Sequence, residues 1–159
     1  MKKIIPALCL LLLVCACGKN GYSVYEGPFF FYFDLSRSST IQINEAGTMD
    51  AEYYVHYTGP QAARTNKVFF SITPGDGLAE GVDYTVTTGS GTLDFMPGFT
   101  DLPIRIKWLP NPIDPAKDNT VTICLDRVDD PSMVLGLPGP DNGNYSKSLR
   151  QIIISKYQN

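Results

Sequence analysis

From residue 29 onward the chain alternates short runs of β-branched and aromatic residues with clusters of glycine, proline, asparagine and aspartate. Successive side chains of a strand point to opposite faces, so an alternation of apolar and polar residues predicts strands with one buried face. An apolar period of 3.6 residues, which would indicate helices, is scarce in this region. The pattern predicts nine strands, at 29–35, 39–44, 51–58, 67–73, 83–88, 91–96, 102–108, 119–126 and 148–156.

The segments between these runs carry the chemistry of turns. Residues 58–60, 74–77 and 110–112 combine glycine, proline, aspartate and asparagine, which turn a chain or exclude it from a central strand. Short strands at regular spacing are typical of a β-sandwich or a β-barrel. We therefore expect one all-β domain, because no internal repeat or second domain boundary interrupts the series.

Alternation also predicts which side chains are buried. In 102–108, Ile104, Ile106 and Trp108 share one face and basic residues occupy the other, as in an antiparallel strand with one face in the core. The run 29–35 is aromatic on both faces. Both of its sides must therefore be covered by other parts of the chain.

Four ring-bearing side chains are expected on outward faces. If the apolar positions of 51–58 point inward, Tyr54 and His56 point outward, and the same parity places Tyr32 and Phe69 on the outward faces of their own strands. Flat rings suit partner surfaces and the faces of sugars, so these four residues are candidate partner-binding or glycan-binding residues. The alternative is that a second layer of the chain covers them.

The first 27 residues have a different character. Residues 1–3 are basic at two positions, and 4–16 form an apolar stretch too short to cross about 30 Å of hydrocarbon. This pattern predicts a secretory signal, and its end, Val-Cys-Ala-Cys at 14–17, resembles a bacterial lipobox. The resemblance implies lipidation at Cys17, which anchors the chain in a membrane, as opposed to an uncleaved anchor or a secreted form. We predict a signal peptide at 1–16, a lipidated cysteine and flexible tether at 17–27, and the sandwich domain at 28–159.

Processing at Cys17 changes the cysteine and charge counts. It removes Cys9 and Cys15 and uses Cys17, which leaves Cys124 without a partner for an intramolecular disulfide. The mature chain keeps 11 basic and 16 acidic residues, a formal charge of about −5. This acid excess argues against nucleic-acid binding.

Two motifs carry a resemblance to a known family. Residues 79–84 (Ala-Glu-Gly-Val-Asp-Tyr) and 91–98 (Gly-Thr-Leu-Asp-Phe-Met-Pro-Gly), followed by alternating strands at 102–108 and 120–128, resemble the Calx-β pattern. With the lipobox, the whole chain resembles small Bacteroidetes-type lipoproteins of a domain-of-unknown-function family. The resemblance implies an antiparallel, immunoglobulin-like β-sandwich of about seven to nine strands. It also implies a place beside outer-membrane glycan-uptake systems.

Signatures of catalysis and of cofactors are missing from the sequence. His56 is the only histidine, which excludes a zinc site with two histidine ligands and an H-E-x-x-H helix. No G-x-S-x-G elbow, dinucleotide fingerprint or P-loop occurs. We expect no enzymatic activity, no cofactor and no metal ligand set.

Calcium is the one metal that the resemblance suggests as a ligand. Related Calx-β domains can bind it through acids at strand ends, and Asp83, Asp126, Asp129 and Asp130 are the candidates here. However, 109–118 has prolines and a lysine where contiguous carboxylates are expected. We favour a turn role for Asp83 and a solvated loop at 129–131, with calcium as the alternative.

These observations predict a non-catalytic lipoprotein of the outer membrane that serves as an accessory binding or scaffolding module. Its expected partners are the membrane, through the anchor, and a glycan or the proteins of a glycan-uptake system. The alternative is a structural, adhesion or assembly module, with or without bound calcium. Residues 18–20 lack the acids common in surface-exported lipoproteins, so the cell surface and the periplasmic face both stay open.

Overall fold

The alternating segments form β-strands in the computed structural model of the protein, which describes residues 29–60, 63–89, 91–136 and 149–158. These residues contain ten strands, and helices long and apolar enough to cross a membrane do not occur among them. Cys17, the predicted signal peptide at 1–16 and the tether at 17–27 lie outside the described residues.

The first sheet has its strands in the order β5-β7-β3-β1-β9. They are β1 (Phe30–Asp34), β3 (Met49–Thr58), β5 (Tyr84–Val86), β7 (Asp101–Trp108) and β9 (Val134–Leu135). The long strand β3 is central and pairs antiparallel with both β1 and β7. At the edge, β9 runs parallel to β1, with Val134 opposite Phe30.

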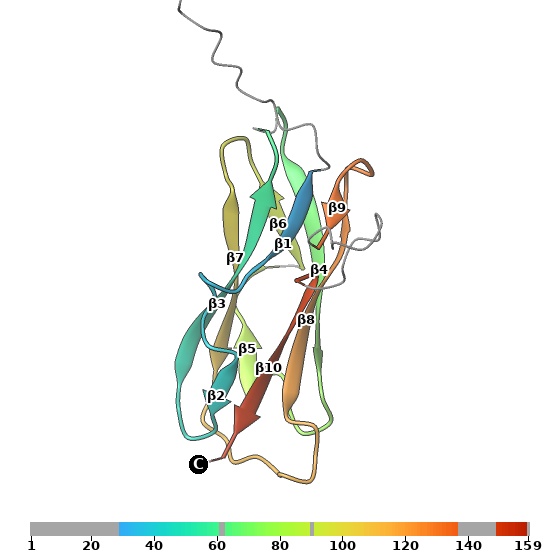
Figure 1. The fold of residues 1–159 in the computed structure, drawn as a ribbon. Helices are drawn as coiled ribbons and strands as arrows, with labels where there is room; N and C mark the ends of the chain where they lie inside the picture. The colour runs from blue at the N-terminus through green and yellow to red at the C-terminus, as the bar shows by residue number, and fades with distance from the viewer. Residues whose placement is uncertain (1–28, 61–62, 90, 137–148, 159) are drawn as a thin grey trace, which may run out of the picture.

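The second sheet has the order β2-β10-β8-β4-β6. Its strands are β2 (Gln42–Asn44), β4 (Asn66–Pro74), β6 (Thr92–Phe95), β8 (Thr120–Val128) and β10 (Gln151–Tyr157). Here β8 is central and antiparallel to β4 and β10, while the short β2 runs parallel to β10. Figure 1 shows the two sheets as the layers of a sandwich.

The predicted all-β sandwich is confirmed, and each of the nine predicted runs contains a strand. Two features differ in detail. Strand β9 has two residues, too few for alternation to reveal, and β1/β9 and β2/β10 are parallel pairs in otherwise antiparallel sheets. Pairing between segments far apart in the chain depends on the path of the whole domain, and local alternation carries no information on it.

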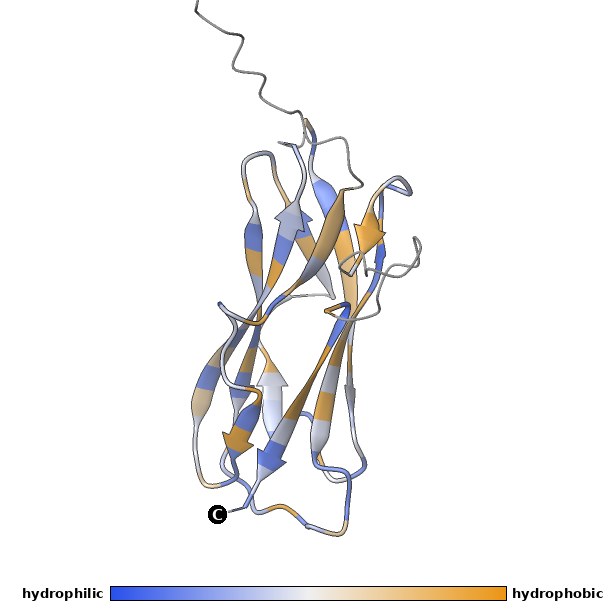
Figure 2. Ribbon diagram, in the orientation of Figure 1, coloured by the Kyte–Doolittle hydropathy of each residue, from blue (hydrophilic) through white to orange (hydrophobic). Residues whose placement is uncertain are grey.

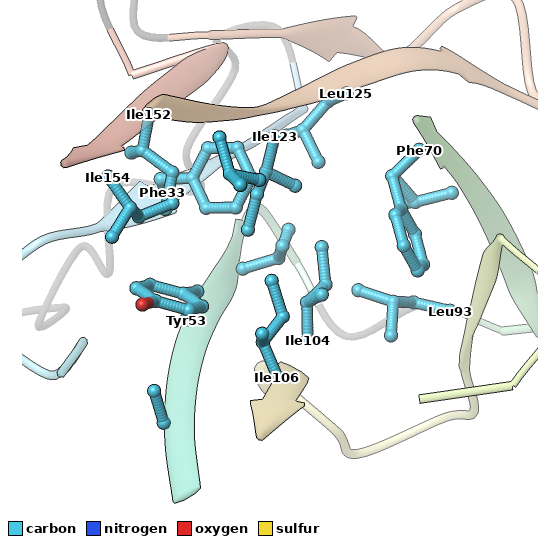
Figure 3. Packing of buried hydrophobic residues seen from close by; sticks show 14 of the residues in the cluster. Phe33, Tyr53, Phe70, Leu93, Ile104, Ile106, Ile123, Leu125, Ile152 and Ile154 are labelled. Atoms are coloured by element: carbon cyan, nitrogen blue, oxygen red, sulfur yellow. The ribbon is translucent and has the colours of Figure 1, made fainter. Parts of the chain in front are cut away.

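The inward faces of both sheets form one hydrophobic core. Tyr53, Val55, Ile104, Ile106 and Trp108 of the first sheet are fully buried, as the alternation predicts. Figure 3 shows how side chains of both sheets fill the space between them, and Figure 2 shows the matching bands of hydrophobic and hydrophilic residues along the strands. Burial of this apolar surface is the main force that holds the layers together.

A polar contact lies within this core. The indole Nε1 of Trp108 donates to the hydroxyl of Tyr53 at 3.1 Å, and the two residues lie on the adjacent strands β7 and β3. Burial raises the pKa of Tyr53 to about 12. The bond satisfies the donor that a fully buried tryptophan brings into an apolar interior.

A buried ion pair joins the two sheets. Lys156 is the third inward position of β10, after Ile152 and Ile154, and its Nζ donates to Asp83 Oδ1 at 2.9 Å. The side chains of Lys156 and Asp83 are 0% and 4% exposed. Asp83 directly precedes β5 of the first sheet, so the pair links the layers.

Further hydrogen bonds surround this pair. Asp83 Oδ1 also accepts from Asn111 Nδ2 at 3.0 Å, Asp83 Oδ2 accepts from the Ala79 backbone N–H at 2.9 Å, and Lys156 Nζ donates to the Leu109 carbonyl at 3.1 Å. Burial raises the pKa of Asp83, but the bonds from Asn111, Lys156 and Ala79 outweigh burial and hold it below its ordinary value. The bond to Ala79 confirms the predicted turn role of Asp83, and Gly81 supplies the positive φ of 84° in that turn.

Replacing Lys156 with methionine, which keeps the apolar stem, is expected to lower the free energy of unfolding by about 3–5 kcal/mol, because it leaves the Asp83 carboxylate buried without its counter-charge. Urea denaturation measures the change. The double variant Lys156→Met/Asp83→Asn is expected to recover part of the loss. The matched control is Lys67→Met, which removes an exposed pair with Asp94 and should change the free energy by less than about 1 kcal/mol. A loss for Lys156→Met no larger than that of the control would contradict the proposed link.

The same pair gives the stability a pH dependence. Because the folded state lowers the pKa of Asp83, its contribution is complete above the ordinary value of 3.8 and is lost as the pH falls through the lower folded value. The free energy of unfolding is therefore expected to fall more steeply between about pH 5 and about pH 2 in the wild type than in Lys156→Met/Asp83→Asn. Urea titrations at a series of pH values measure both slopes, and equal slopes would show that Asp83 adds no acid sensitivity.

Candidate functional site

Three of the four predicted ring-bearing residues gather on the outer face of the first sheet. Tyr32 of β1 lies opposite His56 of β3, and their ring centroids are 5.2 Å apart in an edge-on arrangement. Tyr54 lies two residues before His56 on the same face of β3 and is half-buried like the other two. The outward parity predicted for these residues is correct, and we refer to this face as the outer aromatic surface.

A chain of polar contacts begins at His56. His56 Nδ1 lies 2.6 Å from Asp101 Oδ1, on the neighbouring strand β7, and Arg37 Nη1 lies 2.7 Å from the other oxygen, Oδ2. Thr100 Oγ1 also donates to Oδ2 at 2.9 Å. Partial burial raises the pKa of Asp101, but the hydrogen bonds from His56 and Thr100 and the charge of Arg37 outweigh it and hold the pKa below its ordinary value.

A second chain of contacts runs along the same face. The Arg37 guanidinium lies over the Tyr54 ring, 4.8 Å from its centroid, and the Tyr54 hydroxyl donates to Glu52 Oε2 at 2.6 Å. Arg105 Nε donates to Glu52 Oε1 at 2.8 Å. The bonds from Tyr54 and Arg105 lower the pKa of Glu52, and the same Tyr54–Glu52 bond raises the pKa of Tyr54. Rings, cations and carboxylates thus contact one another across β1, β3 and β7.

A hollow adjoins the polar end of this surface. Its volume is about 370 Å³, and its walls include Ser39, Glu52, Thr87 and Arg105. That size lies at the lower end of the range for small-molecule sites, and the lining offers hydroxyl, carboxylate and guanidinium groups. The aromatic rings of the outer aromatic surface therefore lie beside a hollow that is lined with hydrogen-bonding groups.

Phe69 lies apart from the other three residues. It is on β4 of the second sheet, half-buried on the outer face, and the Arg127 guanidinium carbon lies 3.3 Å from its ring centroid. The outer faces of the two sheets point away from each other, so Phe69 and Tyr32 cannot contact one ligand that lies flat on either face. Residue parity predicts that a side chain points outward, but it does not tell which sheet carries the strand.

The polar partners on the outer aromatic surface were not predicted. Arg37 follows β1 in a turn, Asp101 begins β7, and Asp34 ends β1. His56 and Asp101 are 45 residues apart in the chain and meet only because β3 and β7 pair in this register. One ligand-type atom each of Asp34, His56 and Asp101 lies within 4.8 Å of the others, which makes them the one group among the described residues with metal-ligating potential.

The acids raised as calcium candidates each have a protein partner. They lie on different segments, and their contacts are Asp83 with Lys156, Asp126 Oδ1 with Ser71 Oγ at 3.0 Å, Asp129 Oδ1 with the Lys67 N–H at 3.0 Å, and Asp130 Oδ2 with Arg64 Nη2 at 2.8 Å. Bonds from Ser132 and Arg64 lower the pKa of Asp130 to about 2. Calcium takes six to eight oxygen ligands around one point, whereas these carboxylates hold loops and strand ends.

Comparison with known proteins shows the fold. The crystal structure of CBD12 from CALX1.2 is similar at a TM-score of 0.52 and 17% identity, over 81% of this chain and 44% of that chain. The crystal structure of the calcium binding domain CBD12 of CALX1.1 gives 0.48 and 15%, over 82% and 44%. This chain spans less than half the length of either structure. Neither a protein-family model nor a curated protein sequence matches the chain. The first similarity confirms a Calx-β-like, immunoglobulin-like sandwich.

Calcium titration is expected to give no saturable heat and no rise in melting temperature, because the candidate acids are engaged by Lys156, Ser71, Lys67 and Arg64. Isothermal titration calorimetry of the chelator-treated protein measures the heat, and thermal unfolding with and without Ca²⁺ measures the shift. A saturable calcium heat that disappears in Asp126→Asn or Asp129→Asn would contradict the expectation.

Proposed function

We propose that the chain is a non-catalytic lipoprotein, anchored in the outer membrane through Cys17, whose sandwich is an accessory binding or scaffolding module for glycan uptake. The lipobox-like end of the apolar stretch supports the anchor. The outer aromatic surface supports the binding role, and it is the observation on which that role depends. Its target is a glycan or a protein of the uptake system.

The chemistry of the surface suits a sugar or a polar protein partner. The half-buried Tyr32 and Tyr54 rings offer apolar edges and faces, although Arg37 covers part of Tyr54. Such rings pack against the flat apolar faces of a pyranose or against a partner's side chains. Arg37 and Arg105 offer planar sets of donors that match paired oxygens. Glu52 and Asp101 supply acceptors beside them. The surface thus combines apolar area with directional hydrogen bonding, as binding sites do.

The geometry also favours binding through preorganisation. Glu52 and Arg37 each contact the Tyr54 side chain, and His56 contacts the Tyr32 ring. Side chains that are already held in one rotamer lose less conformational entropy when a ligand arrives. Apart from Arg37, which lies in the turn after β1, these side chains are carried by the strands β1 and β3, which give better positional accuracy than loops.

A structural, adhesion or assembly module is the second candidate function. The similarity to the Calx-β-like sandwich of CBD12 favours it, because the fold alone is sufficient for a spacer or assembly role. On this alternative the outer aromatic surface contacts another protein subunit and no sugar.

Binding tests separate these functions. The lipoprotein, purified from membranes in mild detergent, is applied to a glycan array and used in pull-downs from envelope extracts. The variant Tyr32→Ala/Tyr54→Ala is expected to lose at least about tenfold in affinity for whatever ligand is found, since truncation of central aromatic residues costs about 2 kcal/mol or more. The matched control Phe69→Ala alters a ring on the opposite sheet and is expected to leave the affinity unchanged.

The outcomes have distinct meanings. Binding to a glycan supports the first candidate, and binding only to a protein subunit supports the second. A folded protein that binds neither glycans nor envelope proteins, or a control variant that weakens binding as much as the double variant, would overturn the role of the outer aromatic surface. Circular dichroism and thermal unfolding establish that each variant is folded.

A further inference from the structure

Three potential ligand residues converge on the outer face of the first sheet from its three middle strands. Asp34 ends β1, His56 lies near the end of β3, and Asp101 begins β7. Cross-strand pairing places His56 opposite Asp101 on one side and opposite Tyr32, two residues before Asp34, on the other. One donor atom from each residue lies within 4.8 Å of the other two.

We propose that Asp34, His56 and Asp101 bind one divalent transition-metal ion, for which Zn²⁺ is the probe. Ligand bonds to zinc measure about 2.0–2.2 Å for nitrogen and oxygen, so donors around one ion lie roughly 3–3.5 Å apart. Binding therefore requires side-chain rotations that bring the donor atoms from within 4.8 Å of one another to that range. The site is half-buried, so protein supplies one side of the coordination sphere and solvent reaches the other.

The donor set selects the class of metal. Two carboxylates and one imidazole form a mixed nitrogen and oxygen set, which suits Zn²⁺ and its neighbours in the first transition row. Calcium and magnesium prefer oxygen ligands alone, and calcium takes at least six of them. Three protein ligands leave a position for water or for a donor atom of a bound partner, as in zinc sites with an open coordination position.

Neighbouring contacts orient the ligands before any ion binds. The 2.6 Å contact between His56 Nδ1 and Asp101 Oδ1 already brings two ligand residues together, and it is released when these two atoms bind the ion. The edge-on contact with the Tyr32 ring orients His56, and Ser36 holds Asp34 Oδ1 through its N–H at 2.9 Å and its hydroxyl at 2.6 Å. Hydrogen bonds of this kind to ligand side chains raise metal affinity by fixing ligand geometry. These contacts therefore orient His56 and Asp34 before the ion arrives.

One cation opposes the metal at this site. Arg37 Nη1 lies 2.7 Å from Asp101 Oδ2, and half of its side-chain surface is exposed. Its positive charge competes with a divalent ion for the same carboxylate and repels that ion at short range. Removal of this charge is therefore expected to strengthen metal binding, an effect that a nonspecific zinc contact elsewhere would not show.

Isothermal titration of the chelator-treated, detergent-solubilised lipoprotein with Zn²⁺ tests the proposal. One ion per chain is expected. The variants Asp34→Asn and His56→Gln are expected to weaken binding at least about tenfold, and Arg37→Met is expected to strengthen it several-fold. Substitution with Co²⁺ adds a visible absorption band that reports on the ligand set and is expected to change in His56→Gln.

Two matched control variants distinguish zinc binding at this site from zinc binding by other donor groups. Asp94→Asn removes an exposed carboxylate of β6 in the second sheet, and Cys124→Ser removes the thiol that most readily binds stray zinc. Both are expected to bind Zn²⁺ like the wild type. Zinc binding that is absent, that survives in both Asp34→Asn and His56→Gln, or that disappears in Cys124→Ser would overturn the proposal.

This inference is independent of the proposed partner or glycan role, because every titration is done without a partner. If the ligand variants lose stability, the affinity of Arg37→Met for Zn²⁺ still tests the proposal, since Arg37 is exposed and supplies no ligand atom. Unchanged or weaker zinc binding in Arg37→Met would count against the site. Failure of the glycan and pull-down tests would leave the zinc result unaffected.

Discussion

The apolar core holds the two sheets together, and the buried pair of Lys156 and Asp83 is the polar constraint that this core must accommodate. Two charges removed from water are tolerated only if each finds its partner and its remaining hydrogen bonds, and here Asn111, Ala79 and Leu109 supply those bonds. The turn at 79–84, the segment after β7 and the last strand must therefore assemble together. In the motif that resembles Calx-β domains, Asp83 is paired with a lysine of the same chain, and both of its carboxylate oxygens accept hydrogen bonds from protein groups.

The outer aromatic surface depends on the same sandwich in another way. The core fixes β3 between β1 and β7, and the registers of these pairs then bring Tyr32, His56 and Asp101 into one row across the sheet. Because the row is built on paired strands, its rings and charges keep their relative positions without help from loops. The proposed partner-binding role and the proposed metal site use different properties of this surface: half-buried rings with polar neighbours in one case and converging donor atoms in the other.

Prediction from the sequence succeeded for the features that are encoded within a single strand. Alternation gave the strands, the burial of Trp108 and Tyr53, and the outward direction of Tyr32, Tyr54, His56 and Phe69. It did not give the two parallel edge pairs, the two-residue strand β9, or the separation of Phe69 from the other three. Those features depend on which strands become neighbours, and a period of two is the same in every strand of either sheet.

By itself, therefore, the sequence determined the fold class and the inner and outer faces of the strands, since both follow from the alternation of side chains along an extended backbone. Only the tertiary structure decided that Lys156 meets Asp83 and that Asp34, Arg37, His56 and Asp101 meet on one face. These contacts are determined by strand order and register, which result from the packing of the whole core. Contacts between residues 45 or 73 positions apart have no counterpart in any local pattern.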